Sequence, residues 1–162
     1  MKPPAFALQA LGLLFALWAH AAEAVPLRPV LERGLPLLRT FSPKDYGAHA
    51  VNFAVSQDLR GLIYVANEDG LLEFDGLRWR LIRTANNSSP RSLAVAPSGR
   101  VYVGAGGEVG YLESDASGQS RYVSLLDQIP PEDRGLTDVW QTFSTPRGIV
   151  FFTPQRLLRL TG

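Results

Sequence analysis

Apolar and polar residues alternate along three segments of the chain, and in each segment a short apolar run follows a polar turn that ends in glycine. The segments are residues 51–79, 92–118 and 139–160. The turn glycines are Gly61, Gly99 and Gly148, and the runs that follow them are LIYV, VYV and IVFF. Alternation with a period of two predicts strands rather than helices. Its recurrence at intervals of about 40 residues predicts a series of similar β-units.

Each unit continues with a second turn and a third short strand, which reads LLEF, YLES or LLRL. The first two units add a turn and a fourth strand at 78–82 and 121–125, whereas the third unit stops before its outer strand. Turns such as Asp75-Gly76 indicate hairpins, because glycine reaches positive φ at low cost. Four antiparallel strands per unit are typical of β-propeller blades, and a β-sandwich with similar strands is the alternative.

The predicted fold is therefore all-β: a partial β-propeller of about three four-stranded antiparallel blades, preceded by a helical signal peptide. The expected blades span residues 51–84, 92–126 and 139–162. Residues 25–50 form a lead-in segment, and residues 51–162 form an incomplete propeller domain.

Residues 1–24 have the pattern of a secretory signal peptide. Lys2 provides a positive start, Ala5 to Ala19 form an apolar run, and Ala22-Glu23-Ala24 matches a cleavage site between small residues. An uncleaved membrane anchor is the alternative, but the run is shorter than the roughly 20 residues that a spanning helix needs. The chain has no cysteine, and export without disulfides suits a bacterial periplasm. We therefore expect a periplasmic location.

The composition of the chain limits the kinds of partner and catalytic or metal site that we expect. The formal net charge is +1, which gives no electrostatic reason to expect a nucleic-acid partner. The absence of cysteine removes thiolate catalysis and cysteine-type zinc sites. His49 has no second histidine beside it in the mature chain, so we expect it to be structural. Blade one is rich in carboxylates, which we expect to cap turns rather than to converge on a metal or form a catalytic pair. They are Asp58, Glu68, Asp69, Glu73 and Asp75.

Two stretches of the sequence, QDLRGLIYVANEDGLLEFDGLRW and RSLAVAPSGRVYVGAGGEVGYL, resemble the opening blades of the two-component-regulator propeller family. The family pattern of aspartate, turn glycine, β-run and Gly-Leu-x-x-Phe-Asp-Gly lies on Asp58 to Gly76. A Gly-x-Gly-Glu-x-Gly-Tyr variant lies on Gly104 to Tyr111, with one extra glycine. In the third unit, Gln155-Arg156 stands where the second turn would have its glycine. The resemblance implies a periplasmic sensor domain of a bacterial signalling receptor.

The stretch YVGAGGEVGYL at 102–112 also suggests a phosphate-binding loop. Such a loop must open a helix, and residues 111–126 show no helical period, so nucleotide binding is rejected. In a blade, Gly104 to Gly110 would join the second and third strands, where backbones approach closely. Glu108 would then be a solvated residue of that turn. The candidate ligand contacts are Glu108 and Trp140, which is expected to start the innermost strand of blade three and to reach the central channel.

These observations predict a non-enzymatic, ligand-sensing segment of an exported bacterial receptor, with no catalytic, metal or cofactor site assigned. The family resemblance implies an output domain outside this chain: a histidine kinase, a diguanylate cyclase or a DNA-binding regulator. Propellers close with about 4–8 blades, so the chain is interpreted as the front of a longer receptor. The expected partners are an unidentified small-molecule or glycan ligand and the remaining blades, with membrane contact only through a missing C-terminal part. A secreted propeller enzyme (a lyase or a glycan-degrading protein) and a surface-binding repeat protein are the alternatives.

Overall fold

The computed structural model describes residues 37–161. The predicted signal peptide at 1–24 and the first part of the lead-in segment therefore lie outside the described residues. The chain divides into two units, residues 1–38 and 39–162, and the description below concerns the second. In the part of the chain that the structure describes, no helix has the length and apolar character needed to cross a membrane.

The described chain is all-β, with three separate antiparallel sheets. A short helix, α2 (Pro43–Tyr46), comes first. Sheet 1 contains β1 (Asn52–Gln57), β2 (Ile63–Asn67), β3 (Gly70–Phe74) and β4 (Trp79–Ile82). Sheet 2 contains β5 (Pro90–Val95), β6 (Val101–Ala105), β7 (Glu108–Ser114) and β8 (Ser120–Ser124). Two 3₁₀ turns follow, η1 (Leu126–Gln128) and η2 (Pro131–Asp133). Sheet 3 contains β9 (Gln141–Thr145), β10 (Gly148–Phe152) and β11 (Leu157–Leu160).

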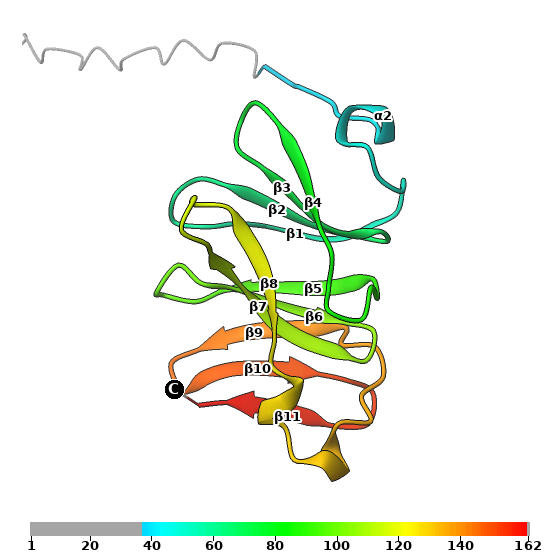
Figure 1. Cartoon of the computed structure of the whole chain (residues 1–162), viewed down its shortest axis with the longest axis vertical. Coiled ribbons are helices and arrows are strands. Elements are labelled where there is room, and N and C mark those ends of the chain that lie inside the picture. Colours follow the sequence, from blue (N-terminus) through cyan, green and yellow to red (C-terminus); the bar gives the residue numbers. More distant parts are fainter. Residues whose placement is uncertain (1–36, 162) are drawn as a thin grey trace, which may run out of the picture. The chain divides into compact units, whose positions relative to one another are not determined.

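Within each sheet the strands pair in chain order, and none of the three sheets closes on itself. Sheets 1 and 2 have four strands each, whereas sheet 3 has three. Consecutive sheets pack through their first strands, so that β1 lies beside β5, and β5 beside β9. Figure 1 shows the resulting succession of sheets, coloured from green through yellow to orange and red.

Two apolar clusters hold the sheets together. The first joins sheets 1 and 2 through Tyr64, Leu71, Ile82, Val101, Val103 and Leu112. The second joins sheets 2 and 3 through Tyr102, Val109, Leu125, Val139, Ile149 and Phe151. Successive residues of a strand point to opposite faces, so neighbours in β6 serve different clusters: Val101 and Val103 face sheet 1, while Tyr102 faces sheet 3. Both faces of the middle sheet are buried, which explains its nearly continuous apolar strands.

The glycine-rich stretch 102–112 is a hairpin, but its turn is shorter than the sequence suggested. β6 runs to Ala105 and β7 starts at Glu108, so only Gly106 and Gly107 form the turn. Gly104 lies inside a strand, where a Cβ atom would collide with the side chain of Val139. Gly110 also lies inside a strand, where a Cβ atom would collide with the ring of Tyr122. The expectation of close approach is therefore confirmed, whereas a turn spanning Gly104 to Gly110 is wrong.

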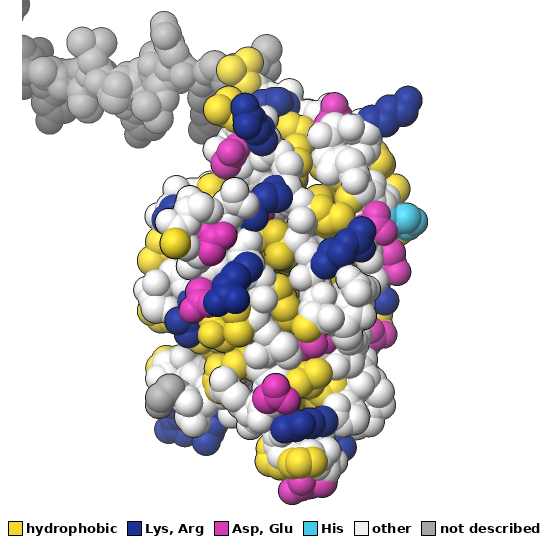
Figure 2. Space-filling model, viewed as in Figure 1, with side chains coloured by type: hydrophobic (Ala, Val, Ile, Leu, Met, Phe, Trp, Pro, Cys, Tyr) yellow, Lys and Arg dark blue, Asp and Glu magenta, His cyan; other side chains and the backbone are white. Residues whose placement is uncertain are grey.

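Phe41 and Tyr46, which precede β1, pack on aromatic side chains of sheet 1. Trp79 of β4 stacks on Phe74 with ring centroids 4.5 Å apart, and Phe41 packs edge-on against both rings. The ring of Tyr46 in α2 packs edge-on against that of Trp79, with ring centroids 5.8 Å apart. Trp79 therefore belongs to an aromatic cluster at the outer strand of sheet 1. On the face drawn in Figure 2, acidic and basic side chains are interspersed, and no large patch of one sign is visible.

Candidate functional site

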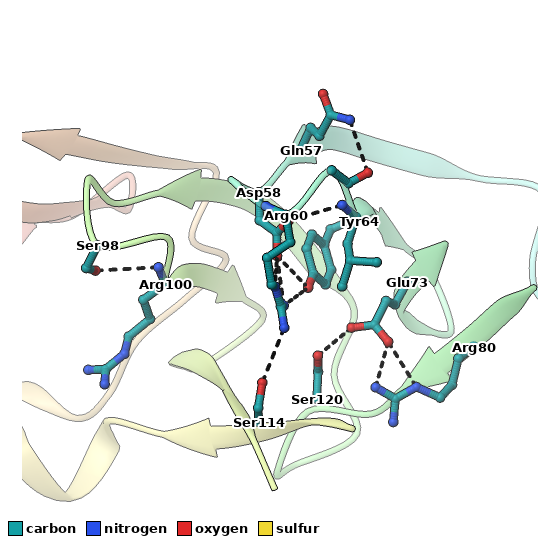
Figure 3. Close-up of polar contacts among 12 residues, drawn as sticks. Gln57, Asp58, Arg60, Tyr64, Glu73, Arg80, Ser98, Arg100, Ser114 and Ser120 are labelled. Carbon is teal, nitrogen blue, oxygen red and sulfur yellow. Dashed lines mark hydrogen bonds and ion pairs between the residues drawn. The ribbon is translucent and has the colours of Figure 1, made fainter. Parts of the chain in front are cut away.

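A cleft of about 340 Å³ lies between sheets 1 and 2. Figure 3 shows polar side chains of the cleft, which come from the β1–β2 turn, from β2, from the β5–β6 turn and from strands β7 and β8, together with neighbouring polar residues. The cleft is lined by Asp58, Leu59, Arg60, Tyr64, Ser98, Gly99, Arg100, Val101, Leu112, Glu113, Ser114 and Ser120. A cleft of this size can hold a small molecule.

Asp58 organises the turn at one end of the cleft. Its Oδ1 accepts hydrogen bonds from the backbone N–H groups of Arg60 (2.9 Å) and Leu62 (3.1 Å), while the Arg60 guanidinium donates to Oδ2 at 2.8 Å. The carboxyl group is 1% exposed. Burial alone would raise the pKa of Asp58, but the hydrogen bonds from Arg60 and Leu62 outweigh it and hold the pKa below its usual value. Asp58 is therefore an ionised turn cap, as the sequence predicted.

Tyr64 lies beneath this turn and is fully buried. Its hydroxyl accepts a hydrogen bond from Arg60 at 3.0 Å and donates one to Asp58 at 3.3 Å. Burial raises the pKa of Tyr64 to about 12. At neutral pH the phenol is protonated and Asp58 is ionised, and both groups are hydrogen-bonded to Arg60 and to each other.

A second set of polar side chains connects the two sheets beside the cleft. Arg80 of β4 donates to Glu73 Oε1 through Nε at 3.1 Å and Nη2 at 2.7 Å. Ser120 of β8 donates its hydroxyl hydrogen to Glu73 Oε2. Arg100, although it lines the cleft, directs its side chain away from Asp58 and Arg60 (Figure 3), and its guanidinium carbon lies 4.4 Å from the Tyr111 ring centroid. Asp58 thus pairs with Arg60, and Glu73 pairs with Arg80, so each carboxylate has a cationic partner.

A second candidate site lies beside the first strands of the three sheets, and we call it the Arg91 cluster. It consists of Phe53, Glu68, Arg91, Asp138 and Trp140. The Arg91 guanidinium carbon lies 4.1 Å from the centroid of the Phe53 ring and 5.5 Å from that of Trp140. Arg91 also pairs with Glu68 at 3.1 Å and with Asp138 at 3.4 Å. One arginine of sheet 2 therefore contacts sheet 1 and the segment that leads into sheet 3.

The local backbone explains how these side chains meet. The register of β1 against β2 shifts at Phe53, and that of β5 against β6 shifts at Arg91, so both residues lie at equivalent irregularities near the strand starts. Such irregularities redirect a side chain. Trp140 directly precedes β9, and its predicted place as the first residue of that strand is off by one position. Trp140 is 47% exposed.

Glu108, the other residue singled out from the sequence, is not solvated. It is the first residue of β7 and is 1% exposed, so the expectation of a solvated turn residue is wrong. Its Oε1 accepts hydrogen bonds from the Ser124 hydroxyl at 2.7 Å and from the Val109 N–H at 3.1 Å. The short Gly106-Gly107 turn places Glu108 in the strand, and Tyr122 packs beside it. Burial raises the pKa of Tyr122, and the negative charge of Glu108 raises it further.

The acidic side chains of sheet 1 and its turns serve separate local contacts. Asp75 caps the β3–β4 turn by accepting hydrogen bonds from the N–H groups of Leu77 and Arg78. Asp69 accepts a hydrogen bond from the backbone of His49, whose ring in turn accepts one from the N–H of Val51. Within residues 37–161, no three histidine or carboxylate side chains converge as ligands of a metal ion.

The two arginines at the centre of these sites, Arg60 and Arg91, were not identified from the sequence. Arg60 has a local signal, because it lies two positions after the turn aspartate and folds back onto that carboxylate. Arg91 has none, since its partners come from distant positions in the chain. Comparison with protein-family models and with curated proteins gives no match to this chain.

Proposed function

We propose that this chain is a non-enzymatic, ligand-sensing segment of an exported bacterial signalling receptor, of the two-component-regulator propeller type. The observation that carries the proposal is the packing of three up-and-down antiparallel sheets through their first strands, β1, β5 and β9. In a propeller, successive blades pack face to face with their first strands nearest the axis. The chain-order pairing of strands within each described sheet and the contacts between first strands support this architecture.

One face of sheet 3 carries exposed apolar side chains, and this supports the proposal that the complete receptor has further sheets. Ile149 and Phe151 of β10 face sheet 2 and are buried. The alternate positions face the other way, and there Phe143 is 47%, Phe152 38% and Leu157 66% exposed. The corresponding face of sheet 2, which carries Tyr102 and Val109, is covered by sheet 3. Apolar strand faces of this kind are normally covered, and another sheet of the same kind would cover this one.

Ligand sensing is supported by the two polar sites, each of which lies between sheets. A ligand shifts a conformational equilibrium only if it binds one state more tightly than the other. Side chains that connect two sheets are well placed for this, because a change in the packing of the sheets changes their separation. In the proposed receptor, the predicted signal peptide delivers this segment to the periplasm, and an output domain follows beyond the membrane.

The test is the coding sequence that follows Gly162. The proposal predicts further units with the same alternation and turn glycines, then a transmembrane helix, then a kinase, cyclase or DNA-binding domain. Reading the downstream DNA in all frames decides the matter. A stop codon that is followed by no such units in any frame would contradict the receptor proposal and leave an independently assembling β-protein.

A further inference from the structure

We propose that the solvent side of the Arg91 cluster binds a small organic cation, with the Trp140 ring and the Asp138 carboxylate as its main contacts. This inference rests on the proposed ligand-sensing function and adds the chemical class of the ligand: a molecule that carries an ammonium or guanidinium group.

The cluster already holds a cationic group of this kind from within the chain. The Arg91 guanidinium carbon lies over the Phe53 ring, 4.1 Å from its centroid, and over the Trp140 ring, 5.5 Å from its centroid. An aromatic face attracts a cation because its quadrupole is negative there, and tryptophan is the strongest of the aromatic residues in this respect. The combination of aromatic rings and carboxylates around Arg91 therefore selects positive charge.

The cluster also has more negative than positive charge. Glu68 and Asp138 both pair with Arg91, so two carboxylates face one guanidinium. Their side chains are 39% and 36% exposed, whereas that of Arg91 is 18% exposed. The Asp138 contact is long, at 3.4 Å, and within the described residues it uses only Oδ1. Asp138 can therefore accept a hydrogen bond from a second cation without leaving Arg91 unpaired.

Trp140 has room for that second cation. The ring is in contact with Arg91, yet the residue remains 47% exposed. Asp138 lies two positions before Trp140, and both side chains contact Arg91, so the carboxylate and the ring lie near the same guanidinium. A cation placed against the exposed part of the ring is thus within reach of the carboxylate.

The position of the site gives binding a consequence. Arg91 connects sheet 1, through Phe53 and Glu68, with the segment that enters sheet 3. A cation that shares Asp138 with Arg91 weakens the Arg91–Asp138 contact, while Glu68 keeps Arg91 paired. Binding is thus coupled to the contact between sheet 2 and the segment that enters sheet 3, and it would favour any packing of the sheets that binds the cation more tightly.

The experiment is a titration of the full chain with choline, with arginine amide, and with the uncharged isostere of choline in which carbon replaces nitrogen. The chain has three tryptophans, Trp18, Trp79 and Trp140, whose indole N–H signals are followed by NMR at constant ionic strength. Both cations are expected to shift the Trp140 signal and leave Trp79 unchanged. Trp140→Leu is expected to weaken binding of both cations at least about fivefold, the lower part of the range for a cation–π contact. Asp138→Asn is expected to weaken binding of arginine amide at least about fivefold, because its cationic N–H groups can donate a charge-assisted hydrogen bond to the carboxylate. In Trp140→Leu, binding is followed through the backbone amide of residue 140.

The matched control is Phe143→Leu, which removes an aromatic ring with the same 47% exposure from sheet 3 but outside the cluster. Unchanged binding in this variant, together with the losses at positions 138 and 140, supports the inference. Equal binding of the uncharged isostere, equal loss in Phe143→Leu, or no shift of Trp140 overturns it. None of these results bears on the receptor proposal, which depends on the downstream coding sequence.

Discussion

The two interfaces between sheets are built differently, although they join similar units. Sheets 1 and 2 meet through an apolar cluster and, beside it, through charged and hydroxyl side chains around Asp58 and Glu73. Sheets 2 and 3 meet through an apolar cluster that contains Tyr102, Ile149 and Phe151. They also meet through a hydrogen bond between the buried hydroxyl groups of Ser92 and Thr142. The first interface therefore has a cleft lined by polar groups, whereas the second depends mainly on apolar packing.

The two interfaces therefore differ in how strictly they require particular partner groups on the neighbouring sheet. Burial of apolar surface is non-directional and tolerates many partners. Buried charges are stable only when each has its partner in place, because an unpaired one is costly. The first interface is thus sensitive to pH and to the loss of single polar groups. The second is sensitive mainly to the loss of side-chain volume.

The largest effect is expected from Phe151→Ala in the second interface. Phe151 is 2% exposed and packs against Tyr102 and its neighbours. Its truncation leaves a cavity and is expected to lower the free energy of unfolding by about 3–5 kcal/mol. The control is Phe152→Ala at the next position, which lies on the opposite face and is 38% exposed; its loss should stay below about 1 kcal/mol. Urea denaturation compares them, and equal losses would show that the two faces of sheet 3 are not distinct.

A smaller effect is expected from Asp58→Asn in the first interface. The loss of a charge-assisted bond to Arg60 should cost about 2 kcal/mol at neutral pH. Because the pKa of Asp58 is lowered in the folded protein, its ionised form contributes stability above the unfolded pKa of about 3.9, and this is lost as pH falls through the lower folded value. The variant should therefore lose less stability than the wild type on acidification. Denaturation curves at several pH values measure this, and Asp75→Asn is the matched exposed cap, with a smaller expected loss. Parallel acid profiles in the wild type and Asp58→Asn would contradict the prediction.

The smallest effect is expected at Tyr64. Its folded pKa of about 12 exceeds the unfolded value of about 10, so the protonated phenol contributes stability below about pH 10 that is lost as pH rises through the folded value. Tyr64→Phe should cost about 1 kcal/mol at neutral pH and should remove this alkaline loss. Ultraviolet difference absorbance during an alkaline titration should show one tyrosine fewer in the late step. An unchanged late step would mean that Tyr64 ionises as an ordinary phenol.

The strand order and the turn aspartates followed from local patterns. Asp58 and Asp75 accept hydrogen bonds from backbone N–H groups two to four positions ahead, and such bonds depend only on nearby residues. The place of Glu108 was mistaken, because the strands extend further into the glycine stretch than a run of glycines suggests. Gly104 stands inside a strand because Val139, 35 positions further along the chain, packs against it and leaves no room for a Cβ atom.

The sequence by itself determined that the chain forms short antiparallel strands in repeated units, because a period of two and the turn residues are local properties. Only the tertiary structure decided which side chains share a site. Phe53, Arg91 and Trp140 lie in three different units, and they meet because β1, β5 and β9 lie side by side. Contacts of this kind depend on how one sheet packs on the next, and no pattern within a single unit encodes that packing.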